Sequence, residues 1–161
     1  MDIVPLNSVH LDPSNVRKHN ERNLETIAAS LQRFGQQKPI VVDAKGIIRA
    51  GNGTYAAAKS LGWKEIGIVR TKLEGAEAIA YAIADNRTAE LAEWDIADLS
   101  AHWQSLDEDL QKVTGFAEED MAALLATITP PTFLPVGEDE QGRLDQKAPT
   151  ICPKCGHEWT V

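Results

Sequence analysis

A glycine turn between an apolar run and an alanine-rich segment is the part of this sequence best suited to chemistry. Residues 47–50 read Ile-Ile-Arg-Ala, and Gly51-Asn52-Gly53 follows before Thr54 opens a segment expected to be helical. This layout points backbone N–H groups and the positive end of a helix dipole at one spot, which suits a phosphate. The alternative is a plain structural turn that joins a strand to a helix.

The only two cysteines, Cys152 and Cys155, form a second candidate site. Their Cys-x-x-Cys-Gly spacing is typical of a zinc-ribbon knuckle, in which the turn aims both thiolates at one metal and the glycine lets the backbone fold beneath them. His157 is a third candidate ligand. The fourth ligand is left open between His10, His19, His102 and a second chain. A redox pair and a knuckle without metal are the alternatives, and a disulfide framework is excluded.

Strand, turn and helix signals predict an α+β fold, with a small α/β part in front and a helical part behind. Strands are expected over 2–9 (interrupted at Pro5), 39–42, 47–48 and 66–70. Helices are expected from a cap at Asn20 or Asn23 to Gly35, and over 54–61, 74–91, 96–103, 107–113 and 118–128. The glycine turn therefore falls at a strand-to-helix junction.

Composition divides the chain further. Residues 1–95 should form the α/β domain, 96–128 a helical extension, 129–150 a flexible linker rich in proline and acids, and 151–161 a tail that carries the knuckle. Residues 1–73 hold 11 Lys/Arg and 6 Asp/Glu, whereas residues 74–161 hold 5 and 18, which together give the net charge of −8. We expect a polyanion-facing first half, with ordinary surface charge as the alternative.

No run is long enough for a membrane span, and no signal pattern stands at the N-terminus. We therefore expect a cytoplasmic protein with no membrane partner. Trp63, Trp94 and Trp103 adjoin expected helix boundaries and are predicted to be core or interface anchors rather than base-stacking platforms.

Four segments, in order, resemble the ParB-like N-terminal domain of the ParB/sulfiredoxin superfamily, often labelled a ParB-like nuclease domain. They are Leu11–Arg17, Ser30–Val42, Ala50–Thr54 and Ala84–Arg87, and Trp94-Asp95 closes the match. The likeness covers roughly residues 2–95. That superfamily includes short phage and prophage proteins, and its ParB-like members imply a small α/β fold.

The resemblance implies CTP with Mg²⁺ as the ligand, and a set of nucleotide or phosphate contacts. The residues are Arg17, Gln37, Gly51, Asn52, Gly53, Thr54, Asn86 and Arg87. His19 is interpreted as incidental, and Arg87 has an alternative role as an ion-pair partner of Glu90 or Glu93. Thr54 stands where the family usually has arginine, so one hydroxyl replaces a charged, bidentate phosphate grip.

These patterns support three functional hypotheses. The first is a CTP-type nucleotide-binding accessory protein of a phage or mobile element, associated with DNA or a DNA-processing protein, with a homodimer joined through shared zinc as one arrangement. The second is a metal-dependent DNA nuclease, which needs Asp85 and Asp95 near Gly51 rather than as helix caps. The third is an interaction module with a degenerate pocket. Nucleotide hydrolysis is left open, and sulfiredoxin activity is excluded because the loop lacks a cysteine.

Overall fold

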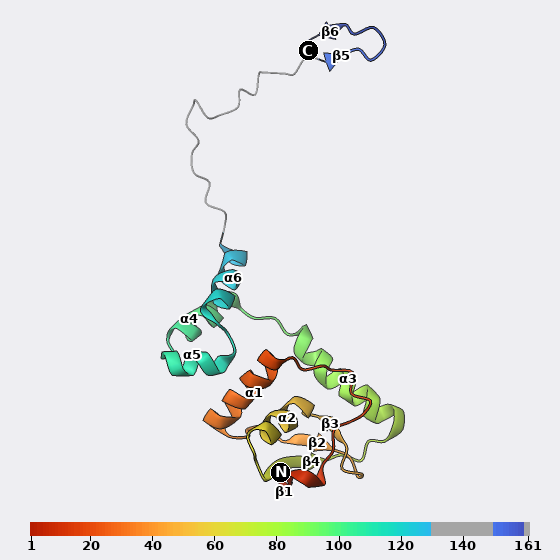
Figure 1. Ribbon diagram of the computed structural model, residues 1–161, viewed down its shortest axis with the longest axis vertical. Coiled ribbons are helices and arrows are strands. Elements are labelled where there is room, and N and C mark those ends of the chain that lie inside the picture. Colours follow the sequence, from red (N-terminus) through yellow and green to blue (C-terminus); the bar gives the residue numbers. More distant parts are fainter. Residues whose placement is uncertain (130–149, 160–161) are drawn as a thin grey trace. The chain divides into compact units, whose positions relative to one another are not determined.

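The computed structural model describes residues 1–129 and 150–159, which belong to two compact units, Met1–Ile128 and Thr129–Val161 (Figure 1). The first unit holds a four-stranded sheet and six α-helices, and the described part of the second is a hairpin. Nearly all of the predicted linker lies outside the described residues. None of the described helices combines the length and apolar character that crossing a bilayer requires.

The sheet of the first unit has the strand order β1-β4-β2-β3. Its strands are β1 (Asp2–Pro5), β2 (Ile40–Val42), β3 (Ile48–Ala50) and β4 (Glu65–Arg70). The central pair β2 and β4 is parallel, and the outer pairs β1/β4 and β2/β3 are antiparallel. The apolar runs that predicted these strands become the core, which contains the fully buried Ile40, Val42, Ile48, Ile66 and Ile68.

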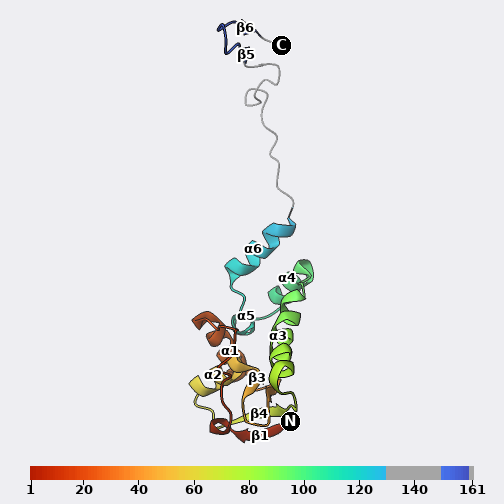
Figure 2. The ribbon, with the colours of Figure 1, turned by 90° about the vertical axis from the view of Figure 1, so that its right-hand side faces the viewer.

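Helices α1 (Glu21–Phe34) and α2 (Asn52–Ser60) pack against each other beside this sheet (Figure 2). The predicted caps of α1 are confirmed: Asn20 accepts a hydrogen bond from the Asn23 N–H, and Gly35 ends the helix at a φ of 68°. The predicted start of α2 at Thr54 is wrong. The Tyr55 N–H already donates to the Gly51 carbonyl, so the helical pattern begins with the glycine turn itself.

The predicted first strand is also too long. β1 ends at Pro5, the Leu6 N–H still donates to the Lys64 carbonyl at 2.8 Å, and the chain then turns as a 3₁₀ helix, η1 (Leu6–Ser8). This turn buries Leu6 in the core. The strand predicted at 47–48 forms as β3, which extends through Ala50 and thus leads directly into Gly51.

The helical part comprises α3 (Gly75–Leu91), α4 (Ile96–Gln104), α5 (Glu108–Thr114) and α6 (Glu118–Ile128). All four were predicted. α3 runs beside β3, α4 contacts α6, and α5 contacts α1. Arg22 of α1 forms an ion pair with Asp120 of α6, which ties this helical part to the front of the unit.

The tryptophans differ in how deeply they anchor these parts. Trp63 packs against the buried core, and Trp103 is half-buried. Trp94 is 65% exposed, and its ring meets Phe116 edge-on at 6.0 Å. The prediction of packing roles therefore fits Trp63 best.

Candidate functional site

The glycine turn leads into α2, and two features of the backbone require glycine at Gly51. Its φ is 94°, in the left-handed region, and an added Cβ would lie 2.5 Å from Cγ2 of Ile40. No side chain caps α2. The N–H groups of its first turn therefore have no side-chain acceptor, which is the arrangement that binds anions at helix N-termini.

A cavity of about 190 Å³ opens at this turn. It brings together six of the predicted site residues: Arg17, Gly51, Asn52, Gly53, Thr54 and Asn86. They come from three separate stretches of the chain, the loop before α1, the start of α2 and the middle of α3. Residues of three sequence segments that resemble ParB-like proteins thus line one cavity.

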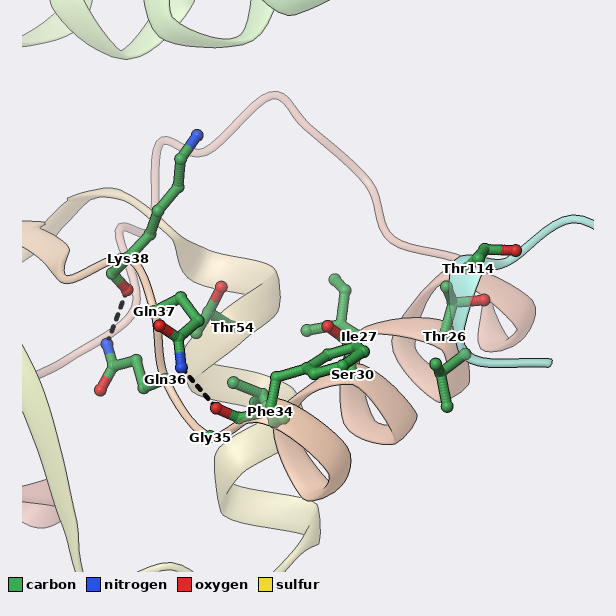
Figure 3. Close-up of a pocket in the computed structure, with 12 residues that line it drawn as sticks. Thr26, Ile27, Ser30, Phe34, Gly35, Gln36, Gln37, Lys38, Thr54 and Thr114 are labelled. Carbon is green, nitrogen blue, oxygen red and sulfur yellow. Dashed lines mark hydrogen bonds between the residues drawn. The ribbon is translucent and has the colours of Figure 1, made fainter. Parts of the chain in front are cut away.

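A second cavity, of about 400 Å³, lies next to the first (Figure 3). Thr54 and Ile27 line both. The remaining lining of the larger cavity comes from α1, the loop into β2 and the end of α5, and it includes Phe34, Gln37 and Val113. Gln37, predicted as a nucleotide contact, therefore belongs to this neighbouring space and not to the smaller cavity.

The loop that carries Gln37 is fixed to the sheet by Gln36. Its Nε2 donates to the Gly67 carbonyl at 2.8 Å, and its Oε1 accepts the Gly67 N–H at 2.7 Å. Nε2 also donates to the Lys38 carbonyl at 3.0 Å (Figure 3). Because the Gln36 side-chain amide bonds β4 through both its nitrogen and its oxygen, the neighbouring Gln37 and Lys38 are kept at the cavity wall.

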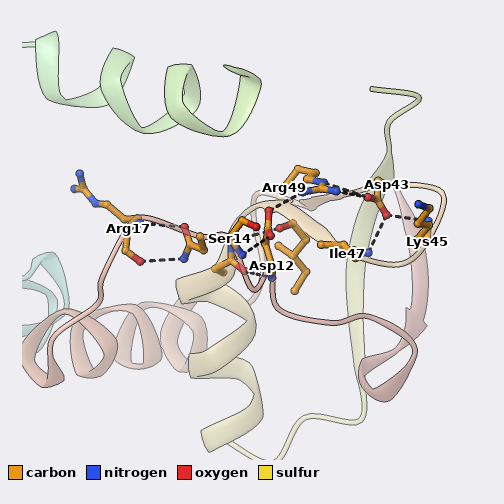
Figure 4. Close-up of polar contacts among 10 residues, drawn as sticks. Asp12, Ser14, Arg17, Asp43, Lys45, Ile47 and Arg49 are labelled. Atoms are coloured by element: carbon orange, nitrogen blue, oxygen red, sulfur yellow. Dashed lines mark hydrogen bonds and ion pairs between the residues drawn. The ribbon is translucent and has the colours of Figure 1, made fainter. Parts of the chain in front are cut away.

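Arg49, which also lines the smaller cavity, is the centre of a buried ion cluster (Figure 4). Its guanidinium donates to Oδ2 of Asp43 through Nε at 3.1 Å and through a terminal nitrogen at 2.7 Å. The other terminal nitrogen donates to Oδ2 of Asp12 at 2.7 Å. The three side chains are only 14%, 7% and 9% exposed for Arg49, Asp43 and Asp12. The cluster joins the loop before α1 to β3 and to the β2–β3 turn.

The polar groups around Asp43 decide its ionisation. Burial alone would raise the pKa of this carboxyl, but the Ile47 N–H, the Arg49 guanidinium and the Lys45 N–H outweigh burial and lower the pKa. Burial would likewise lower the pKa of Arg49, and its bonds to Asp43 and Asp12 raise the pKa instead. Asp43 and Arg49 each favour the charged form, and the guanidinium of Arg49 already has two carboxyl partners.

Arg17 and Arg87, the two other arginines near the turn, share one carboxylate. Arg17 forms an ion pair with Oε1 of Glu90, and Arg87 with Oε2 of Glu90 at 3.2 Å. The hydrogen bond from Arg17, then that from Arg87, lowers the pKa of Glu90. The ion pair predicted between Arg87 and Glu90 is confirmed. Arg87 is not among the residues that line the smaller cavity.

Two other residues have clearer roles in the structure than in the sequence. Asn52 is buried, and its Oδ1 accepts the Asp12 N–H at 3.4 Å, so it links the loop before α1 to α2. His19 lies against the turn: a Cβ on Gly53 would lie 2.7 Å from its Cε1. Its Nδ1 lies 2.6 Å from Oδ1 of Asn23. The sequence pattern predicts no role for His19 at the nucleotide site, because no spacing signal connects it with Gly53.

The two aspartates that a nuclease would need do not meet. Asp85 lines the smaller cavity together with Gly51. Asp95 caps α4, where its Oδ1 accepts the Asp98 N–H at 3.1 Å. Within the described part of the chain, no three His, Cys, Asp or Glu side chains are grouped closely enough to hold a metal ion.

The second candidate site lies in the hairpin of β5 (Thr150–Ile151) and β6 (Glu158–Trp159). The N–H groups of Lys154 and then Cys155 donate to the Cys152 sulfur, and these bonds together with the Cys155 thiol lower the pKa of Cys152. The Gly156 N–H donates to the Cys152 carbonyl at 2.9 Å, with Gly156 at a φ of 74°. His157 is not grouped with the two thiols as a metal site in the described residues.

Comparison with known proteins identifies the architecture of the first unit. No family model matches the chain. The C-terminally truncated chromosome-partitioning protein ParB from Caulobacter crescentus, complexed with CTP-gamma-S, superimposes with a TM-score of 0.66. The alignment covers 81% of this chain and 79% of that chain at 19% sequence identity. The chain has a ParB N-domain-like fold. The predicted fold class is thereby confirmed.

Sequence likeness supports the same relationship. The chain is 29% identical over 65 residues to the ParB-like nuclease domain-containing protein YnaK of Escherichia coli (strain K12), a match that covers 40% of this chain and 75% of YnaK. The Caulobacter protein complexed to the centromeric parS site aligns with a TM-score of 0.47 and 20% identity, over 81% of this chain and 73% of that chain. The predicted resemblance to ParB-like proteins is confirmed in sequence by YnaK and in fold by the complex with CTP-gamma-S.

Proposed function

We propose that this ParB-like protein binds a cytidine nucleotide and acts as a DNA-associated accessory protein of a phage or mobile element. The observation that carries the proposal is the pair of adjoining cavities that share Thr54 and Ile27. One cavity sits at the uncapped start of α2 and the other beside Gln37. A nucleotide has the same division into an anionic part and a planar, less polar part.

The smaller cavity suits the phosphates. The N–H groups of the α2 first turn and the Thr54 hydroxyl offer hydrogen bonds, and Arg17 offers the positive charge that Thr54 lacks. Arg49 adds little attraction because Asp12 and Asp43 already neutralise it. Asp85 and Asn86 would offer side-chain oxygens to Mg²⁺ if it came with the nucleotide, since Mg²⁺ is usually held by one or two protein oxygens, phosphates and water.

The larger cavity suits the base. Phe34 and Val113 offer apolar walls, and Gln37 brings an amide that can donate and accept hydrogen bonds. The Caulobacter ParB that shares this fold was solved with CTP-gamma-S, which supports cytidine as the base to test first. At 19% identity that likeness supports the fold rather than the ligand, so the nucleotide must be measured.

The DNA part of the proposal rests on relatives and on charge. YnaK is named for a ParB-like nuclease domain, and the Caulobacter protein is a chromosome-partitioning protein. The first 73 residues of this chain carry 11 Lys/Arg against 6 Asp/Glu. A net positive first half favours contact with a polyanion or with a DNA-bound partner.

The C-terminal hairpin adds a proposed metal site. We propose that Cys152 and Cys155 bind Zn²⁺, with His157 as a third candidate ligand. Two backbone N–H groups aimed at the Cys152 sulfur favour its thiolate, which is the form that binds metal. The knuckle turn at Gly156 supports the same assignment.

Calorimetric titration tests the nucleotide proposal. The purified protein should bind CTP more tightly than ATP or GTP, and binding should require Mg²⁺. Arg17→Ala should weaken binding roughly 10-fold, because it removes a charged phosphate contact. Arg33→Ala, which alters an exposed arginine of α1 outside both cavities, is the matched control and should change nothing. Absence of binding by all three nucleotides would favour the interaction-module hypothesis.

A metal-dependent nuclease is the second candidate, favoured by the name of YnaK and by Asp85 in the cavity. Plasmid nicking measured with Mg²⁺ or Mn²⁺ tests it. Nicking that is lost in Asp85→Asn and retained in Asp95→Asn would support the nuclease, since only Asp85 lies at the cavity. Nicking that survives both substitutions would exclude a role for these carboxylates.

A further inference from the structure

The C-terminal hairpin carries the only two cysteines of the chain in one turn. The Cys152 N–H donates to the His157 carbonyl and the Gly156 N–H donates to the Cys152 carbonyl, both at 2.9 Å, so Cys152 and Cys155 lie in one tight turn. Structural zinc takes four ligands in a tetrahedron. Within the described part of the chain no third His, Cys, Asp or Glu joins the pair as a metal-binding group. The two thiols can supply two of the four ligands that structural zinc takes.

The hairpin also needs an additional source of stability. β5 and β6 are two residues long each, and Ile151 is 56% exposed. A two-stranded hairpin of this size is marginally stable at best in water, and units this small usually depend on a metal, a disulfide or oligomerisation. Because metal binding contributes directly to folding in such units, a completed zinc site would stabilise the turn.

The exposure of the thiols shows from which side the missing ligands can come. Cys155 is exposed and Cys152 is half-exposed. A second hairpin can therefore approach the sulfurs from solvent without unfolding the first. Two identical knuckles that meet at one metal form a two-fold symmetric contact, which is the commonest arrangement in homodimers.

We infer that one Zn²⁺ is bound by Cys152 and Cys155 of two copies of this chain, which joins them through their C-terminal hairpins. The inference rests on the zinc binding proposed above and names the partner that completes the site. A Zn²⁺ with four thiolates carries a net charge of about −2. Lys154 lies between the cysteines of each knuckle, so the two copies bring two positive charges to offset it.

The test measures zinc content and molar mass on the same full-length sample. Elemental analysis should find one zinc per two chains, and light scattering should give the mass of a dimer. A chelator should remove the zinc and yield monomers, and added Zn²⁺ should restore dimers. Cys152→Ser and Cys155→Ser should each lose zinc and dimer, whereas Glu158→Gln, at an exposed position of β6, should keep both.

Replacement of zinc by Co²⁺ reports the ligands. Four thiolates should give roughly twice the sulfur-to-cobalt charge-transfer absorption per metal of two thiolates. One zinc per monomeric chain would overturn the shared site but not the proposal that the hairpin binds zinc. Loss of zinc in His157→Ala would have the same meaning. A protein without zinc would overturn both, and a dimer that persists in the cysteine variants would overturn the link through the hairpin. Nucleotide titration of Cys152→Ser keeps these outcomes separate from the first unit's function.

Discussion

Two arginine–carboxylate clusters flank the glycine turn, and they differ in almost every physical respect. Arg49 meets Asp12 and Asp43 in a space that leaves its side chain 14% exposed. Arg17 and Arg87 meet Glu90 at the surface, with side chains 46%, 61% and 41% exposed, respectively. The same chemical pairing therefore occurs once shielded from water and once in contact with it.

The difference separates a structural cluster from an exchangeable one. A buried pair loses solvation that it cannot regain, so removal of one partner leaves an uncompensated charge. An exposed pair contributes little to stability because water and salt compete with it. Arg17 can therefore release Glu90 and bind a phosphate at small cost, whereas Arg49 cannot release its two aspartates. On this basis the cavity's usable positive charge comes from Arg17.

The largest effect should follow from loss of the buried arginine. Arg49→Ala leaves Asp12 and Asp43 buried without their partner and should lower the free energy of unfolding by about 3–5 kcal/mol. Urea denaturation monitored by circular dichroism measures the change. The control is Arg49→Ala combined with Asp12→Asn and Asp43→Asn, which should recover part of the loss. A loss below about 1 kcal/mol would contradict the structural role of the cluster.

The second-largest effect should come from acid, which removes the contribution of Asp43 to folding stability. The lowered pKa of Asp43 means that the folded state favours its ionised form below the ordinary value of 3.8. The unfolded state then binds more protons, so this contribution is complete above about pH 5 and is lost as the pH falls through the folded-state pKa. Urea titrations between pH 6 and pH 3 should show it. Asp43→Asn should lower stability at pH 6 and flatten the acid decline, and an unchanged decline would assign it to other groups.

The contrast between the clusters also explains what the sequence could reveal. The caps at Asn20 and Gly35 act within one helix, so local pattern was enough to predict α1. Arg49 stands out as a charge within an apolar strand, but its partner Asp12 is 37 residues away and has no spacing signal. Glu90 is 73 residues from Arg17. The resemblance to a known family connected the sequence segments that line the cavity. The ion pairs of Arg49 with Asp12 and of Arg17 with Glu90 could be identified only from the folded structure.

A smaller effect should come from removing the exposed carboxylate. Glu90→Gln frees Arg17 and Arg87 from their shared partner and should tighten CTP binding roughly 2- to 10-fold, because phosphate no longer competes with a carboxylate. Calorimetry at low ionic strength measures it. Glu93→Gln removes a neighbouring acid with the same change of charge and should have a lesser effect. Equal gains in both variants would indicate general electrostatics instead of competition for the arginines.

The smallest effect distinguishes the two arginines of the exposed cluster. Arg87 does not line the phosphate cavity, and its bond to Glu90 joins neighbours on one helix. Arg87→Ala should therefore leave stability unchanged and alter CTP affinity less than about twofold, since such helix pairs are weak. The same titration as for Arg17→Ala measures it. If Arg87→Ala weakened binding as strongly as Arg17→Ala, ligand binding would have to break the Glu90 pairs and move α3, so that Arg87 reaches the phosphates.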